Sequence, residues 1–184
     1  MKRIFWLLPA ILLFCAGAPA QEAPQWELGG SYTYAAANIS PSYASRFTMS
    51  GGGFSIEENL NDWFGGRFEM TALSGTEAGS NVNAQTYTFG PVFSYRKLDL
   101  VTPFAHAQLG AIHAGLGYLG ISAPATRFDL AAGGGVEVTV SKYVAVRFQG
   151  DYGLSHFLNL RQNNLLISAG IVVRLGSARR TNSY

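Results

Sequence analysis

Residues 143–154 read YVAVRFQGDYGL, and their side chains alternate between two kinds. Small or polar residues occupy every second position from Ala145 to Gly153 and include Arg147, Gln149 and Asp151. The positions between them carry mainly apolar side chains: Val144, Val146, Phe148, Gly150, Tyr152 and Leu154. Successive side chains of a β-strand point to opposite faces, so this period of two predicts a strand with one polar and one apolar face.

The same alternation recurs along the chain, and no segment shows the apolar spacing of an amphipathic helix. We predict eight strands, at 26–34, 46–57, 63–73, 85–96, 100–115, 126–141, 143–156 and 164–176. The connections are expected to be short after the second, fourth and sixth strands and long after the first, third and fifth. Short turns at one end and long loops at the other are typical of outer-membrane barrels, whose smallest strand number is eight. The sequence therefore predicts an all-β fold, an eight-stranded antiparallel up-and-down transmembrane β-barrel.

The polar strand faces indicate which side of this barrel is inside. A secreted, lipocalin-like barrel would turn its apolar face inward, whereas a membrane barrel turns it outward. The polar positions hold few Lys and many Gly, Ser and Thr, which suits the narrow interior of eight strands better than a solvated surface. Charged residues make up only 13% of the chain, against about 25% in ordinary soluble domains. We therefore expect the polar face to line the lumen.

Charges of both signs lie in mid-strand on this predicted lumen face. They are Glu27, Arg67, Glu69, Arg96, Asp129, Glu137, Arg147, Asp151 and Arg174. An isolated charge in a narrow lumen is costly, so we predict a lumen plugged by ion pairs; the alternative is that these charges keep a solvated face soluble. Large aromatic residues fall toward the strand ends, as expected of two interfacial girdles: Trp26, Tyr32, Tyr34, Phe64, Tyr87, Tyr95, Phe128 and Tyr152.

Two predicted strands are less regular than the rest. In RFTMSGGGFSIE, residues 46–57, the alternation changes parity across Gly51–Gly53. An extra residue in one strand produces such a change, so we predict a β-bulge there. The strand at 100–115 carries His106 and Gln108 on its expected lumen face, opposite mainly small residues.

The N-terminal segment has the features of a secretory signal peptide. Lys2 and Arg3 precede an apolar run that ends near Phe14, and Ala18-Pro19-Ala20 forms an A-x-A cleavage site. We therefore divide the chain into a signal peptide at 1–20, a barrel at 21–176 and a short tail at 177–184. Cleavage would remove the single cysteine and two basic residues, which leaves 11 basic and 11 acidic residues. With no net charge and no basic stripe, the mature chain is not expected to bind nucleic acid.

Two segments resemble known bacterial outer-membrane barrels. SAGIVVRL, residues 168–175, resembles their C-terminal signature polar-x-Gly-x-x-apolar-x-apolar, with Ser168, Gly170, Val173 and Leu175 at the constrained positions. FDLAAGGGVEVTVSKYVAVRFQGDYG, residues 128–153, is similar to the OmpA-like outer membrane protein β-barrel domain family. The resemblance implies insertion by the barrel-assembly machinery into the outer membrane of a didermic bacterium and contact with its lipids. We expect a monomer.

Features that suggest chemistry are weak in this chain. GLGYLG, residues 115–120, matches G-x-G-x-x-G, but the Pro124 that follows argues against the helix that a dinucleotide site requires. His106, His113 and His156 are too scattered for metal ligands, so no metal or cofactor is expected. Some eight-stranded barrels deacylate lipid A with a His, a Ser two residues later and a downstream acid; here Leu158 occupies the Ser position and no acidic residue follows.

These observations favour a non-catalytic outer-membrane barrel with a structural, envelope-integrity or surface-interaction role. A minimal pore for small solutes is the first alternative, since lumenal ion pairs could open transiently. A lipid A-modifying enzyme and a soluble secreted binding barrel are the others.

Overall fold

The computed structural model describes residues 23–37, 47–77, 80–118, 121–157 and 160–177. Within these residues the chain forms eight strands. They are β1 (Trp26–Ala37), β2 (Phe47–Asn59), β3 (Phe64–Glu77), β4 (Ser80–Ser94), β5 (Val101–Tyr118), β6 (Ile121–Ser141), β7 (Val144–Phe157) and β8 (Leu160–Leu175). No helix in the described part of the chain is long and apolar enough to cross a membrane.

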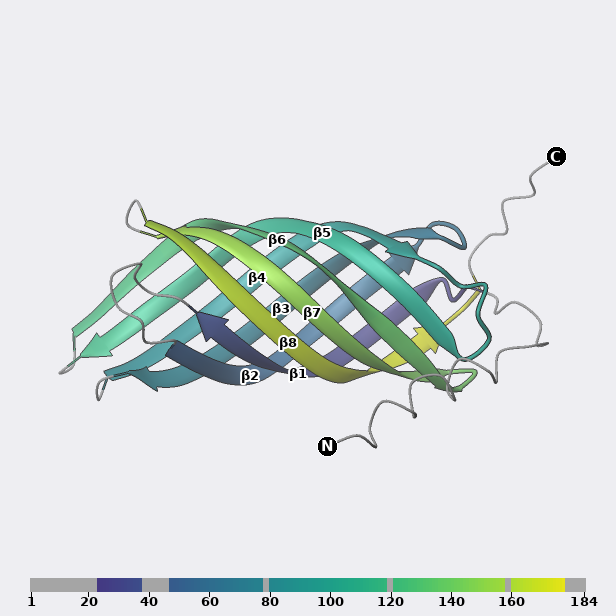
Figure 1. Ribbon diagram of the computed structural model, residues 1–184, viewed down its shortest axis with the longest axis horizontal. Coiled ribbons are helices and arrows are strands. Elements are labelled where there is room, and N and C mark those ends of the chain that lie inside the picture. The colour runs from purple at the N-terminus through teal and green to yellow at the C-terminus, as the bar shows by residue number, and fades with distance from the viewer. Residues whose placement is uncertain (1–22, 38–46, 78–79, 119–120, 158–159, 178–184) are drawn as a thin grey trace, which may run out of the picture.

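The strands form a closed antiparallel barrel in sequence order, as predicted. β8 pairs with β1 from Trp26↔Leu175 to Ala37↔Asn164, which leaves no free sheet edge. The strands are strongly tilted, and β1 begins and β8 ends at the same end of the barrel (Figure 1). We refer to this as the turn end, because short connections join β2 to β3, β4 to β5 and β6 to β7 there. We call the opposite end the hairpin end; there the chain passes from β1 to β2, from β3 to β4, from β5 to β6 and from β7 to β8.

Side-chain alternation places the apolar face outside. Phe148 is 50% exposed and Ile167 is 59% exposed, whereas their sequence neighbours Arg147 and Ser168 are each 6% exposed. The aromatic residues predicted to form girdles lie on this outer face, and Trp63 stacks on Phe93 near the turn end with ring centroids 6.0 Å apart. The outer surface of the barrel is therefore apolar, as expected of a barrel that spans a lipid bilayer.

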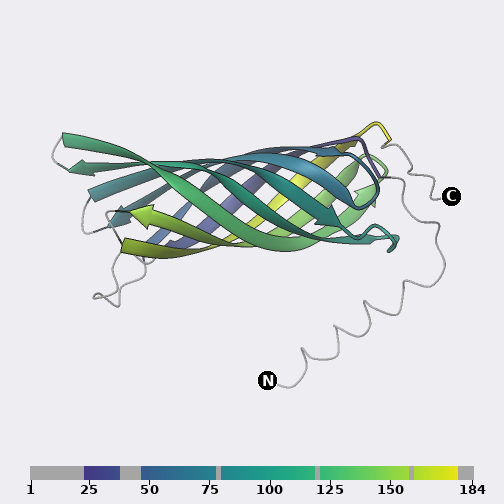
Figure 2. The ribbon, with the colours of Figure 1, turned by 90° about the horizontal axis from the view of Figure 1, so that it is seen from above.

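The strands at the hairpin end are longer than predicted. β3 continues to Glu77, and β4 begins at Ser80, where a loop was expected over 74–84. Similarly, β5 reaches Tyr118 and β6 begins at Ile121, with Gly115 opposite Pro124. The expected long connections after the third and fifth strands are therefore wrong. Loop-like composition was misleading because these segments satisfy their backbone hydrogen bonds by pairing with each other. Figure 2 shows the β5–β6 hairpin extending farther than the β7–β8 hairpin.

The predicted bulge at Gly51–Gly53 is also wrong. β2 pairs without interruption there, with Ser31↔Gly53, Tyr32↔Gly52 and Thr33↔Gly51. The glycines instead permit close packing, because a Cβ on Gly51 would overlap the backbone carbonyl of Ala72. The register shift that the structure contains lies between Thr139 and Ser141, next to the tight β6–β7 turn.

Candidate functional site: the lumenal ion-pair network

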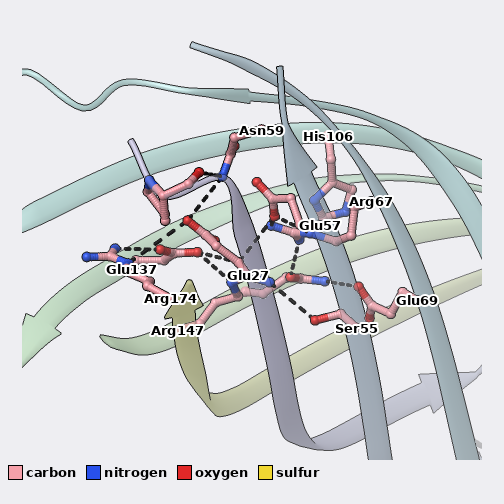
Figure 3. Close-up of polar contacts among 12 residues, drawn as sticks. Glu27, Ser55, Glu57, Asn59, Arg67, Glu69, His106, Glu137, Arg147 and Arg174 are labelled. Carbon is pink, nitrogen blue, oxygen red and sulfur yellow. Dashed lines mark hydrogen bonds and ion pairs between the residues drawn. The ribbon is translucent and has the colours of Figure 1, made fainter. Parts of the chain in front are cut away.

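Seven charged side chains converge inside the turn-end half of the barrel. They come from every strand region except β5: Glu27 from β1, Glu57 from β2, Arg67 from β3, Arg96 just after β4, Glu137 from β6, Arg147 from β7 and Arg174 from β8. All are between 0% and 6% exposed. Six of them occupy inward positions of strands, and Arg96 continues the alternation beyond β4, so the period-two pattern directs all seven toward a common space. We call this set the lumenal network (Figure 3).

Arg147 lies at the centre of the lumenal network. Its Nη2 donates to Glu27 Oε2 at 2.8 Å and to Glu57 Oε2 at 3.2 Å. Its Nε donates to Glu137 Oε1 at 2.7 Å. Through this one guanidinium, β7 is connected to β1, β2 and β6 across the lumen.

Arg174 and Arg96 extend the network toward the turn end. Arg174 Nη2 donates to Glu137 Oε2 at 2.8 Å, so Glu137 bridges two guanidinium groups. Arg96 Nη2 lies 3.0 Å from Glu27 Oε1 and donates to Asn59 Oδ1 at 3.0 Å. Asn59 in turn donates to the carbonyl of Pro24 at 2.9 Å, which connects the network to the segment preceding β1.

An aromatic ring supports the network from β5, which contributes no charge to it. The Phe104 ring lies 4.7 Å from the Arg67 guanidinium carbon and 5.3 Å from that of Arg147. A guanidinium over a desolvated aromatic face is attracted by the ring quadrupole, so Phe104 stabilises both cations. Arg67 also pairs with Glu57, with Nη2 2.7 Å from Oε2.

Gln149 links the network to a second group nearer the hairpin end. Its Oε1 accepts from Arg67 Nη1 at 3.0 Å, and its Nε2 donates to Asp151 Oδ2 at 2.8 Å. Asp151 Oδ1 lies 2.7 Å from His106 Nε2. His106 stacks on Phe104, with ring centroids 6.0 Å apart.

The acidic residues predicted for the lumen have two different environments. Glu27 and Glu137 lie in the lumenal network. Together with Glu57 they provide three carboxylates, which face the four guanidinium groups of the network. Glu69 and Asp129 form no ion pair with another described residue, and Glu69 accepts a hydrogen bond of 3.4 Å from Gln149 Nε2. The four Arg residues of the lumenal network thus lie toward the turn end, whereas Glu69 and Asp129 lie nearer the hairpin end.

Sequence reasoning missed Glu57 and Asn59. The assumed bulge at Gly51–Gly53 obscured the parity of β2 beyond it. Regular alternation from Gly53 through Ser55 would have placed both residues on the lumen face, so the missed signal was the uninterrupted period of two.

The charged groups of the lumenal network contact mainly one another. Its carboxylates are occupied by guanidinium groups, and among the described residues no group of three or more His, Cys, Asp and Glu could hold a metal ion. His113 is exposed on β5, whereas the side chain of His156 and residues 119–120 of GLGYLG lie outside the described residues. The predicted signal peptide at 1–20 and residues 178–184 of the tail lie outside them as well.

The segment that resembles the assembly signature lies in β8, at the seam with β1. Ser168 and Gly170 face the lumen side, and Val173 and Leu175 face outward at 40% and 46% exposure. A Cβ on Gly170 would lie 2.8 Å from the Cα of Ser31, so Gly permits the close approach of β8 to β1. This explains the small residue in structural terms; the role in assembly remains a prediction.

A family model named outer membrane protein beta-barrel domain matches residues 6–172. The chain belongs to this family. No match was found among curated protein sequences. The family assignment and the closed barrel establish a protein of the outer membrane, with the apolar outer face toward lipid.

Solved structures with a similar fold are small outer-membrane barrels. Neisserial surface protein A is 15% identical, with a TM-score of 0.71, and the match covers 82% of this chain and 97% of that one. Ail, the attachment invasion locus protein of Yersinia pestis, is 16% identical with a TM-score of 0.57, covering 82% and 99%. The N-terminal barrel domain of Pseudomonas aeruginosa OprF is 10% identical with a TM-score of 0.58, covering 83% and 98%. At these identities the likeness concerns the fold.

Proposed function

We propose that this outer-membrane barrel is non-catalytic and that it supports the integrity of the envelope or contacts surfaces through its hairpin end. The observation that carries the proposal is the lumenal network, which fills the turn-end half of the barrel with paired charges. Its carboxylates are engaged by guanidinium groups, so the network supports stability and closure rather than supplying a free nucleophile or base. The protein acts as a monomer surrounded by outer-membrane lipids.

Deletion of the gene tests the envelope role. We expect the deletion strain to become more sensitive to detergent and more permeable to a hydrophobic dye, and expression of the wild-type chain to restore both properties. Equal sensitivity and dye uptake in the two strains would refute a role in envelope integrity and leave contact at the hairpin end as the function to test.

Insertion by the barrel-assembly machinery is part of the same proposal. It is supported by the signature at Ser168, Gly170, Val173 and Leu175. Replacement of Leu175 by Asp is expected to lower the amount of folded protein in the outer membrane, measured as the heat-modifiable band on unboiled gels. Leu100→Asp, in a turn-end connection outside the signature, is the control.

A minimal pore is the second candidate. It is favoured by space on both sides of the network: a cavity of about 20 Å³ lies beside Arg147 and Ser55, and one of about 280 Å³ lies beside Arg174 and Tyr143. The network is the main barrier between them. Planar-bilayer recordings test this candidate. We expect the wild type to be silent, and discrete conductance steps in the wild type would establish the pore instead.

A further inference from the structure

A separate cavity lies on the hairpin-end side of the lumenal network. Its volume is about 60 Å³. Polar side chains that line it include Glu69, Thr88, Gln108, Asp129 and Asp151, and Leu73 is part of its apolar wall. We call this cavity the acidic chamber. Along β3, Arg67 belongs to the lumenal network, Glu69 lines the acidic chamber, and Leu73 is part of the apolar wall of the chamber.

The acidic chamber carries an excess of negative charge. Three carboxylates line it, and no described Lys or Arg is among its lining residues. Asp151 is partly engaged by His106 and Gln149. Glu69 and Asp129 have no cationic partner in the described part of the chain, and Asp129 is 7% exposed. A buried carboxylate without a cation is costly, so the chamber favours an occupant with positive charge.

Gln108 provides a second, independent indication of a ligand. It lines the chamber and is 4% exposed. Its Oε1 accepts from Thr88 Oγ1 at 3.0 Å, but its buried Nε2 has no hydrogen-bond partner. Buried amide donors are nearly always satisfied, so this group calls for an acceptor inside the chamber. An occupant should therefore carry a hydrogen-bond acceptor as well as a positive charge.

The lining and the volume of the chamber favour a small organic ligand. No group of three or more His, Cys, Asp and Glu among the described residues is arranged to hold a metal. A volume of about 60 Å³ accommodates roughly four to six water-sized groups. Apolar side chains, including Ala35, Leu73 and Leu166, line the remaining wall and suit methylene groups. The chamber lies within the closed barrel, which excludes the headgroup of an intact membrane lipid.

We propose that the acidic chamber binds a small free amino alcohol, a primary ammonium ion joined by a short alkyl chain to a hydroxyl group. The ammonium group contacts Glu69 and Asp129, the methylene groups lie against Leu73, and the hydroxyl oxygen accepts from Gln108 Nε2. The ligand enters from the hairpin end, because the lumenal network fills the other half of the lumen. Thr86, Ile112 and Asn164 line the chamber and are only partly buried, so solvent reaches it from that side.

Three probes of equal size test the proposal on the unaltered, folded protein. Ethanolamine, ethylene glycol and propylamine each have four non-hydrogen atoms but differ in charge and in the acceptor. Titrations are followed by ¹H–¹⁵N NMR in detergent micelles at constant ionic strength. We expect saturable shifts for ethanolamine at Gln108 and Asp129, at least tenfold weaker binding of ethylene glycol, and several-fold weaker binding of propylamine. Equal binding of ethanolamine and ethylene glycol, or no saturable shift, would overturn the proposal.

Variants then locate the site. The double variant Glu69→Gln/Asp129→Asn should bind ethanolamine at least tenfold more weakly, whereas Asp62→Asn, the same change in an exposed turn, should bind it normally. Unboiled gels verify that each variant is folded, and the single variant Asp129→Asn serves if the double variant does not fold. Unchanged affinity in a folded chamber variant contradicts the assignment.

Discussion

Arg147 on β7 reaches across the lumen to Glu27 on β1, with 2.8 Å between Nη2 and Oε2, although the two residues are 120 positions apart in the sequence. The same guanidinium donates to Glu57 and Glu137. One side chain therefore neutralises carboxylates from three strands, and its removal affects all of them.

Replacement of Arg147 by Ala should strongly destabilise the barrel. It leaves Glu27, Glu57 and Glu137 with fewer cations in a buried space, and removing one partner of a buried ion pair costs about 3–5 kcal/mol. The measurement is the free energy of unfolding from urea titration in detergent. Lys142→Ala, in the exposed β6–β7 turn, should have little effect. A loss below about 1 kcal/mol for Arg147→Ala would show that the network is solvated.

Replacement of Phe104 by Leu should destabilise the protein without removing a charge. The substitution keeps an apolar side chain but removes the ring next to Arg67 and Arg147, and desolvated cation–π contacts are worth up to about 2 kcal/mol each. The same urea titration measures the loss. Phe89→Leu, on the outer face, is the control because it removes a ring without a cation, and an equal loss in both variants would argue against the cation–π contribution.

Gly170 and Gly150 differ in the space around them, so we expect Ala to affect stability differently at the two positions. A Cβ at Gly170 would press on the backbone of β1, whereas a Cβ at Gly150 meets no atom within 4 Å. Overpacking typically costs about 1–3 kcal/mol. Gly170→Ala should therefore lower the temperature at which the folded band disappears from unboiled gels, and Gly150→Ala should leave it nearly unchanged. Equal behaviour of the two variants contradicts the close β8–β1 approach.

Replacement of Phe148 by Arg tests which face contacts lipid. Phe148 lies on the outer face within β7 rather than at either end of the strand, and an Arg near the midplane of the bilayer costs about 2–4 kcal/mol. Tyr143→Arg, at the turn end, should cost about 0–1 kcal/mol because it lies near the interface. Unfolding free energies in lipid vesicles distinguish the two positions. A tolerated Phe148→Arg would mean that this face is in water.

Much of the fold was predictable because alternation depends on local geometry alone. The pattern in 143–154 assigned Arg147 and Phe148 to opposite faces, and the structure places them there. Among the partners of Arg147, Glu137 is its cross-strand neighbour in the β6–β7 hairpin. Glu27 and Glu57 were not predictable, since their contacts depend on barrel register and on side-chain conformations that link distant strands. Strand ends at the hairpin end were missed because composition does not show whether two polar segments pair. The difference between Glu137, which is paired, and Asp129, which is not, likewise arises only from three-dimensional position.

The seam between β8 and β1 also bears on the order in which the barrel forms. β1 comes first in the chain, yet Glu27 gains Arg147 and Arg174 as neighbours only when the last two strands have joined the sheet. A sheet open at this seam would hold guanidinium groups and carboxylates at its two edges without their final partners. The β2–β3 hairpin already pairs Glu57 with Arg67, and the β6–β7 hairpin pairs Glu137 with Arg147. Closure of the cylinder then adds the ion pairs of Glu27 with strands from the far end of the chain, so the charge balance is completed only when the seam forms.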